Sequence, residues 1–115
     1  MKEERERRKE MNKKALKFIR TVLSMILLVA LFLLSIANLA YFHEHVHKAI
    51  FKSYDINSII EYDFLWLGGK TIADRPCPTE ECKSLNNWNE IIGYALSALV
   101  ISLWCMIFAY RIFKD

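Results

Sequence analysis

The fold is decided by two uncharged apolar stretches, TVLSMILLVALFLLSIANLAYF at residues 21–42 and IIGYALSALVISLWCMIFAY at residues 91–110. They contain 22 and 20 residues, and at about 1.5 Å of rise per residue each would form a helix roughly 30 Å long, the thickness of the hydrocarbon core of a bilayer. The whole chain of 115 residues is 54% hydrophobic, yet its apolar residues are not scattered as in a small soluble domain. We therefore predict an all-α membrane protein, a two-span transmembrane helical hairpin, rather than a soluble enzyme, a disulfide-dense toxin or a disordered chain.

The distribution of basic residues predicts the orientation in the membrane. Residues 1–20 carry nine of the 16 Lys and Arg, whereas residues 43–90 carry five against eight acidic residues. Lys and Arg that flank a span tend to stay on the cytoplasmic side. We expect an integral membrane protein with two passes: a basic cytoplasmic helix at 1–20, an uncleaved first span, an extracytoplasmic connection at 43–90 and a cytoplasmic tail at 111–115. The expected partner is the lipid bilayer, and no nucleic-acid partner is expected.

The connection between the spans contains a hairpin signal. Two runs of β-prone residues, SIIEYDFLWL at 58–67 and KTIAD at 70–74, flank the pair Gly68-Gly69. Pro76 cannot donate to a strand ladder, so residues 74–76 should end the hairpin. We expect a small β-hairpin at the outer membrane surface, with Trp66 and Trp88 at the level of the lipid head groups.

All histidines of the chain lie just after the first span, in the sequence His43-Glu44-His45-Val46-His47. On a helix, His43 and His47 project from the same face one turn apart and can share one zinc ion. Glu44 is then placed to act as a general base toward an attacking water molecule. His45 points about 200° away from His43 and is excluded as a ligand. The plainer interpretation is a polar cluster that ends the span.

A catalytic zinc ion needs a third protein ligand. The acidic candidates downstream are Asp55, Glu61, Asp63, Asp74, Glu80, Glu81 and Glu90. Glu90 is preferred because it precedes the second span, so two antiparallel helices bring it beside the outer end of the first span. Its alternative role is helix capping, because an acid in the first turn is favoured by the helix dipole. We predict His43, His47 and Glu90 as zinc ligands and Glu44 as the catalytic residue.

His43-Glu44-x-x-His47 followed by Asn89-Glu90 resembles the zincin metallopeptidases of the gluzincin type, over residues 40–94. In that family two histidines and a downstream glutamate bind zinc, and an aspartate commonly follows one turn later, where this sequence has Tyr94. The stretch also resembles integral-membrane site-2 proteases, although the second span has no acid after Glu90. The resemblance implies a membrane metallopeptidase that cleaves peptide bonds, with a strand of the hairpin holding a peptide substrate as an added strand.

Cys77 and Cys82 leave two further functions open. Outside the cytoplasm thiols tend to oxidise, so a small-ring disulfide is the first interpretation. With the histidines they also satisfy the ligand count of a structural Cys2His2 zinc site. A third possibility needs no metal, because small two-span proteins can serve as non-catalytic accessory subunits that dock on other membrane proteins. Cys105, inside the second span, is expected only to pack.

Overall fold

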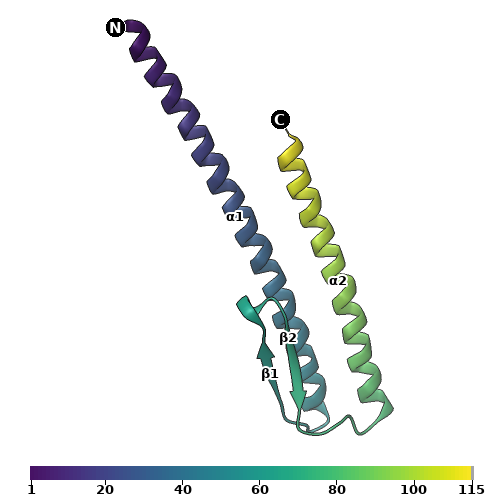
Figure 1. The fold of residues 1–115 in the computed structure, drawn as a ribbon. Coiled ribbons are helices and arrows are strands. Elements are labelled where there is room, and N and C mark those ends of the chain that lie inside the picture. The colour runs from purple at the N-terminus through teal and green to yellow at the C-terminus, as the bar shows by residue number, and fades with distance from the viewer. Residues whose placement is uncertain (115) are drawn as a thin grey trace. The chain divides into compact units, whose positions relative to one another are not determined.

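The computed structural model describes residues 1–114, which form two long helices and a small hairpin in the order α1, β1, η1, β2 and α2 (Figure 1). Helix α1 runs from Lys2–Ser53 and helix α2 from Glu80–Phe113. Between them lie strand β1 (Ser58–Tyr62), the short 3-10 helix η1 (Phe64–Trp66) and strand β2 (Gly69–Ala73). The chain divides into two compact units, residues 1–32 and residues from 33 onward.

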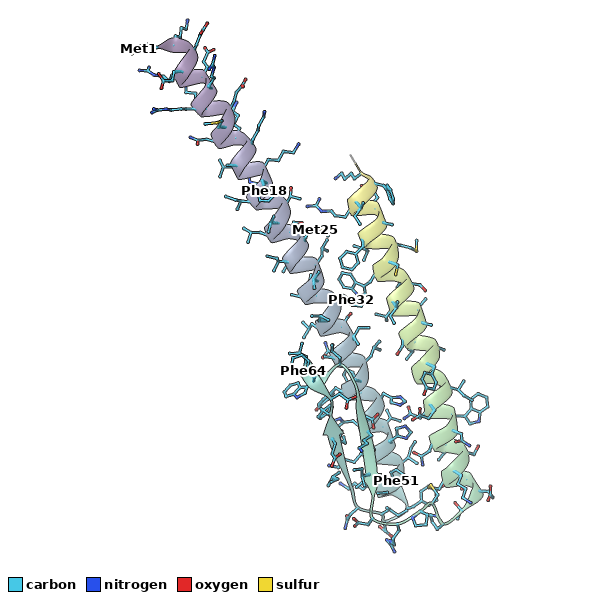
Figure 2. All side chains as sticks on the ribbon, viewed as in Figure 1. Met1, Phe18, Met25, Phe32, Phe51 and Phe64 are labelled. Atoms are coloured by element: carbon cyan, nitrogen blue, oxygen red, sulfur yellow. A yellow bond between two sulfur atoms is a disulfide. The ribbon has the colours of Figure 1, made fainter. Side chains whose placement is uncertain are left out.

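The first unit is the initial part of α1, with its side chains directed away from the helix (Figure 2). It begins with the basic segment, where Arg8 and Glu4 form an exposed ion pair one helical turn apart. Opposite charges at this spacing add a few tenths of a kcal/mol to an exposed helix. The apolar stretch follows without a break, and Phe18 is 70% exposed.

Both helices extend beyond the apolar stretches that predicted them. Helix α1 continues eleven residues past Phe42, so the histidine motif lies on a helix rather than in the connection. Helix α2 begins at Glu80, ten residues before Glu90. Thr79 caps it, because its side chain accepts a hydrogen bond from the backbone N–H of Cys82. Each helix contains an apolar window long enough to cross a membrane.

The hairpin has the expected strands but a different turn. β1 and β2 are antiparallel, with Ser58 paired to Ala73 and Tyr62 paired to Gly69. Gly68-Gly69 therefore does not form the tight turn that the sequence predicted. Residues 63–68 make a longer connection through η1, in which Leu65 and Trp66 both have positive φ angles. The ladder ends at Ala73, just before the segment at 74–76 that was expected to close it.

Within the second unit, α1 and α2 are linked by polar side chains instead of an apolar core. Among residues 1–114 only Ile56, Cys82, Glu44 and His47 are buried. Farther along the pair of helices, the Trp104 indole N–H donates to Ser35 Oγ at 2.9 Å. Ser35 belongs to the first apolar stretch and Trp104 to the second, so this bond links the two helices outside the hairpin region. The two buried polar residues, Glu44 and His47, lie in the part of the unit that contains the hairpin, where Thr71 of β2 bonds to Glu44.

Candidate metal centre

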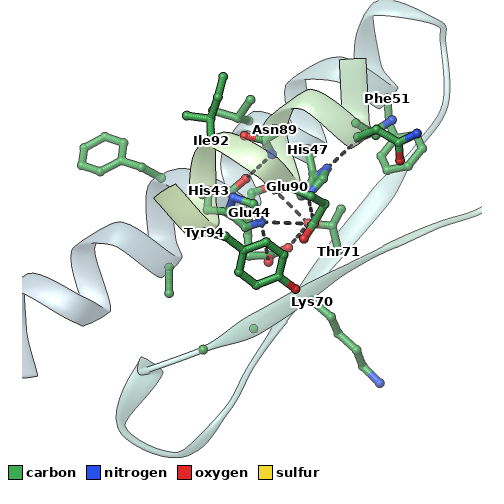
Figure 3. Close-up of a pocket in the computed structure, with 18 of the residues that line it drawn as sticks. His43, Glu44, His47, Phe51, Lys70, Thr71, Asn89, Glu90, Ile92 and Tyr94 are labelled. Carbon is green, nitrogen blue, oxygen red and sulfur yellow. Dashed lines mark hydrogen bonds and ion pairs between the residues drawn. The ribbon is translucent and has the colours of Figure 1, made fainter. Parts of the chain in front are cut away.

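Three predicted ligand side chains meet where α1 faces α2. His43 and His47 come from one face of α1, and Glu90 comes from α2, in its third turn rather than its first. Glu90 Oε1 lies 2.6 Å from His47 Nε2 and 3.2 Å from His43 Nε2. One ligand atom from each residue falls within 4.8 Å of the other two. Two imidazole nitrogens thus converge on one carboxylate oxygen, as Figure 3 shows.

The His47 ring is held at both of its nitrogen atoms. While Nε2 faces Glu90, Nδ1 lies 2.6 Å from Asn86 Oδ1 on α2. Asn86 is four residues before Glu90, so both side chains project from the same face of the helix. The His47 residue is only 7% exposed, and a buried imidazole with two fixed partners has a defined orientation.

The His43 ring is placed mainly by close packing against α2. A Cβ atom built on Gly93 would lie 2.5 Å from His43 Nδ1 and 2.6 Å from its Cε1. Glycine at this position therefore leaves the space that the ring occupies. His43 Nδ1 is buried and has no hydrogen-bond partner within residues 1–114. The backbone of His43 is fixed separately, because the Asn89 amide donates to its carbonyl oxygen at 3.1 Å.

Glu44 lies beside the ligands and is oriented by strand β2. Its Oε1 is 3.9 Å from His43 Nε2, and its side chain is 7% exposed. The Thr71 hydroxyl lies within hydrogen-bonding distance of Glu44 Oε2 and 3.1 Å from the Glu44 carbonyl oxygen, and its single proton serves one of them at a time. Gly69 of the same strand also lies next to Glu44, because a Cβ atom built on it would be 3.5 Å from Glu44 Cγ, an ordinary contact distance. One carboxylate oxygen is thereby left facing the ligands.

The charge on Glu90 is favoured by its neighbours. Partial burial raises the pKa of this carboxyl group, but the hydrogen bonds to His47 and His43 and their positive potential lower it, and the net pKa lies below the ordinary value. An ionised carboxylate next to imidazole nitrogens is a donor set that zinc prefers.

The site opens into a cleft of about 1090 Å³ within the second unit. Its lining combines the ligands with apolar side chains of both helices, among them Leu39 and Leu96. Residues 67–71 and 73–76 also line it, so β2 borders the cleft, and β2 pairs with β1 alone. Tyr94, labelled in Figure 3, also lines the cleft.

The remaining candidates lie outside the ligand group. His45 Nδ1 bonds to the Tyr41 carbonyl oxygen at 2.8 Å, and its ring stacks on the Tyr41 ring, as its exclusion from the ligands requires. Glu61 and Glu80 pair with lysines, Lys70 and Lys83. Neither these two acids nor Asp55, Asp63, Asp74 and Glu81 belong to the group of ligand atoms found within residues 1–114.

Cys77 and Cys82 form a disulfide. Sulfur atoms joined in this way are not thiolates, so in this state they do not supply the ligands of a Cys2His2 site. Cys82 is completely buried, and the bridge lies next to Asn86, whose amide nitrogen is 3.3 Å from Cys77 Sγ. Cys105 remains free and exposed on α2.

The three side chains could hold a metal ion, because one potential ligand atom from each lies within 4.8 Å of the other two. Two imidazoles and a carboxylate leave one position open in a tetrahedral site, as catalytic zinc sites require. The 2.6 Å between His47 Nε2 and Glu90 Oε1 is a hydrogen-bond distance, so a proton lies between these atoms. A metal ion bound by both would hold them farther apart, since zinc bonds to nitrogen and oxygen are about 2.0–2.2 Å long. Comparisons of the chain with protein-family models, curated proteins and solved structures found no match.

Proposed function

We propose that this chain is a two-pass membrane protein that hydrolyses peptide bonds near the outer membrane face, with zinc held by His43, His47 and Glu90. The observation that carries the proposal is the convergence of these three side chains from two helices. Glu44, a buried carboxylate, lies beside them with one oxygen directed at His43 and the other bonded to Thr71. A polar cluster that merely ended a membrane span would not require side chains of two helices to converge on one carboxylate oxygen.

Membrane insertion is supported by where the apolar side chains lie. No residue in the most apolar window of either helix is buried, whereas Glu44 and His47 are buried. This is the reverse of the usual distribution in a soluble domain, and it matches a surface covered by lipid. The excess of Lys and Arg in residues 1–20 supports cytoplasmic termini and an extracytoplasmic site.

The residues around the cleft take separate roles in the proposed reaction. A bound zinc ion supplies Lewis acidity, which polarises a peptide carbonyl and lowers the pKa of water. Glu44 Oε1 accepts the proton of the attacking water and returns it to the leaving amine. Thr71 holds the other Glu44 oxygen, so the base stays directed at the ligands. An extended peptide can add to the edge of β2 that borders the cleft.

The test is the metal content and hydrolytic activity of the full chain, purified in detergent without chelator. We expect one zinc ion per chain in the parent, and loss of zinc in His47→Ala and Glu90→Ala. Glu44→Gln should keep zinc but lower the hydrolysis of a peptide mixture by about 10²- to 10⁴-fold, because only the base is lost. The matched control is His45→Ala, since His45 bonds away from the cluster and its loss should leave zinc unchanged.

The identity of the atoms bound to the metal distinguishes the proposed site from the alternative functions. X-ray absorption should give nitrogen and oxygen neighbours at about 2.0–2.1 Å and no sulfur at about 2.3 Å. Sulfur neighbours would favour the Cys2His2 site instead. A parent that binds no zinc would overturn the proposal, and copurification with a larger assembly would then favour an accessory subunit.

A further inference from the structure

Asn86 contacts a proposed metal ligand on one side and the disulfide on the other. Its Oδ1 lies 2.6 Å from His47 Nδ1. Its Nδ2 lies 3.0 Å from the Cys82 carbonyl oxygen, 3.3 Å from Cys77 Sγ and 3.8 Å from Cys82 Sγ. Cys82, Asn86 and Glu90 follow one another at four-residue spacing on α2, so they share one face of the helix.

The chemistry of these partners fixes the orientation of the Asn86 amide. The carbonyl oxygen of Cys82 can only accept a hydrogen bond, so the amide nitrogen must face it. Asn86 Oδ1 then faces His47, and as an amide oxygen it can only accept. His47 Nδ1 must therefore carry a proton, whether or not Nε2 carries another, so a metal ion could bind His47 only at Nε2.

This choice of tautomer matters for the metal. In a neutral imidazole that is protonated at Nδ1, the free electron pair is at Nε2. His47 Nε2 is the atom that faces Glu90, so Asn86 selects the tautomer in which His47 can bind a cation there. Outer partners of this kind orient metal-binding histidines and raise their basicity.

The other histidine of the pair has no such support. His43 Nδ1 is buried and has no hydrogen-bond partner in the described part of the chain, residues 1–114. The position one turn after Glu90, where gluzincins commonly have an aspartate, is Tyr94, a residue that is 74% exposed. Of the two imidazoles, only the His47 ring therefore has a side-chain partner at Nδ1, the nitrogen that faces away from the proposed metal position.

We propose that Asn86 is the positioning residue for the metal ligand His47, and that the Cys77–Cys82 disulfide holds Asn86 in place. This inference rests on the proposed function, since it assumes that His47 binds a metal ion. The disulfide thereby supports the metal site from behind without supplying a ligand. Asn86 acts only through His47 and does not touch the reacting atoms.

The experiment measures zinc affinity of the detergent-purified full chain by competition with a chromophoric chelator. Asn86→Leu keeps the approximate size of the side chain but removes its hydrogen bonds, and affinity should fall about 10- to 100-fold. Asn86→Asp keeps an acceptor for His47 Nδ1 and should recover at least half of the loss on a logarithmic scale. Asn87→Leu is the matched control, at an exposed neighbouring position, and should bind zinc like the parent.

A double-mutant cycle then tests the role of the disulfide. Replacing both Cys77 and Cys82 by alanine should weaken zinc binding several-fold in the parent background. In the Asn86→Leu background the same change should have no further effect, because the disulfide acts through Asn86. A loss that persists in that background would overturn the coupling and point to sulfur ligands.

Two outcomes separate this inference from the proposed function. If the parent binds zinc and Asn86→Leu binds it equally well, the positioning role is overturned and the proposed ligand set stands. If the parent binds no zinc, the proposed function is overturned and this inference with it. Misfolding of Asn86→Leu would appear as a loss of helical circular dichroism. In that case Asn86→Asp carries the test, because it keeps an acceptor for His47 Nδ1. If Asn86→Asp then binds zinc no better than Asn86→Leu, the positioning role is overturned.

Discussion

Replacing Gly93 by alanine tests whether the His43 ring must keep its position to bind zinc. The new Cβ would lie 2.5 Å from His43 Nδ1, whereas an ordinary non-bonded contact between heavy atoms is about 3.5 Å. The ring must therefore retreat by roughly 1 Å. Ligand distances in a metal site are fixed to about 0.2 Å, so this shift takes His43 Nε2 out of bonding range.

The expected result is weaker zinc binding and slower hydrolysis without a loss of folding. Zinc affinity should fall by about 10- to 100-fold, and hydrolysis of a peptide should fall by about 100-fold. Displacing the ring costs roughly 1–3 kcal/mol, and the helix preference for alanine over glycine, about 1 kcal/mol, offsets part of this cost. The free energy of unfolding should therefore fall by no more than about 2 kcal/mol, while the site loses zinc binding.

Zinc affinity is measured by chelator competition and helix stability by denaturation in mixed micelles. Ala95→Ser is the matched control, because it adds one atom to an exposed position of the same helix. Parental zinc affinity in Gly93→Ala would refute the assignment of His43 as a ligand. If part of the Gly93→Ala protein fails to fold but its folded molecules bind zinc with parental affinity, the assignment of His43 as a ligand is refuted as well.

Three further substitutions test the support of the site. Thr71→Val leaves a buried oxygen of Glu44 without its hydrogen-bond donor, so the free energy of unfolding should fall by about 1–3 kcal/mol. Hydrolysis should also slow while the zinc content stays the same, and an unchanged rate of hydrolysis would contradict the role of Thr71. Thr79→Ala removes the cap of α2 and should lower stability by about 0.5–2 kcal/mol in a denaturation series. Trp104→Phe loses the bond to Ser35, and a double-mutant cycle with Ser35→Ala should give a coupling energy of about 0.6 kcal/mol; a coupling of zero would contradict the bond.

The apolar stretches predicted the helices because a run of about 20 uncharged residues has few alternatives. The sequence also allowed us to predict that the histidine motif and Glu90 lie close together, because two antiparallel helices bring the adjoining ends of their apolar stretches side by side. The structure brings His43, His47 and Glu90 within reach of one another. It also shows the β-hairpin, which alternating β-prone runs had indicated.

The start of α2 was missed although its signal was present in the sequence. Thr79 followed by Glu80 and Glu81 is typical of a capped helix start with acids in its first turn. Hydropathy alone placed the start near residue 91, because the first turns of α2 are polar. With the correct start, Asn86 would have been seen on the face of the helix that carries Glu90.

The roles of Thr71 and Gly93 could not be derived from local sequence. Thr71 meets Glu44 only because β2 packs against α1 in one particular register. Gly93 reads in sequence as one of several small residues of an apolar helix, and its significance depends on the ring that fills the space beside it. Both roles arise from contacts between elements far apart in the chain.

The division of the ligands between the two helices has a consequence for biosynthesis. His43 and His47 are translated with α1, while Glu90 is reached only after the hairpin has been made and α2 has begun. A nascent chain that carries α1 alone lacks the third ligand. In the proposed arrangement, the metal site and its hydrolytic chemistry are therefore incomplete until α2 has been made and has paired with α1.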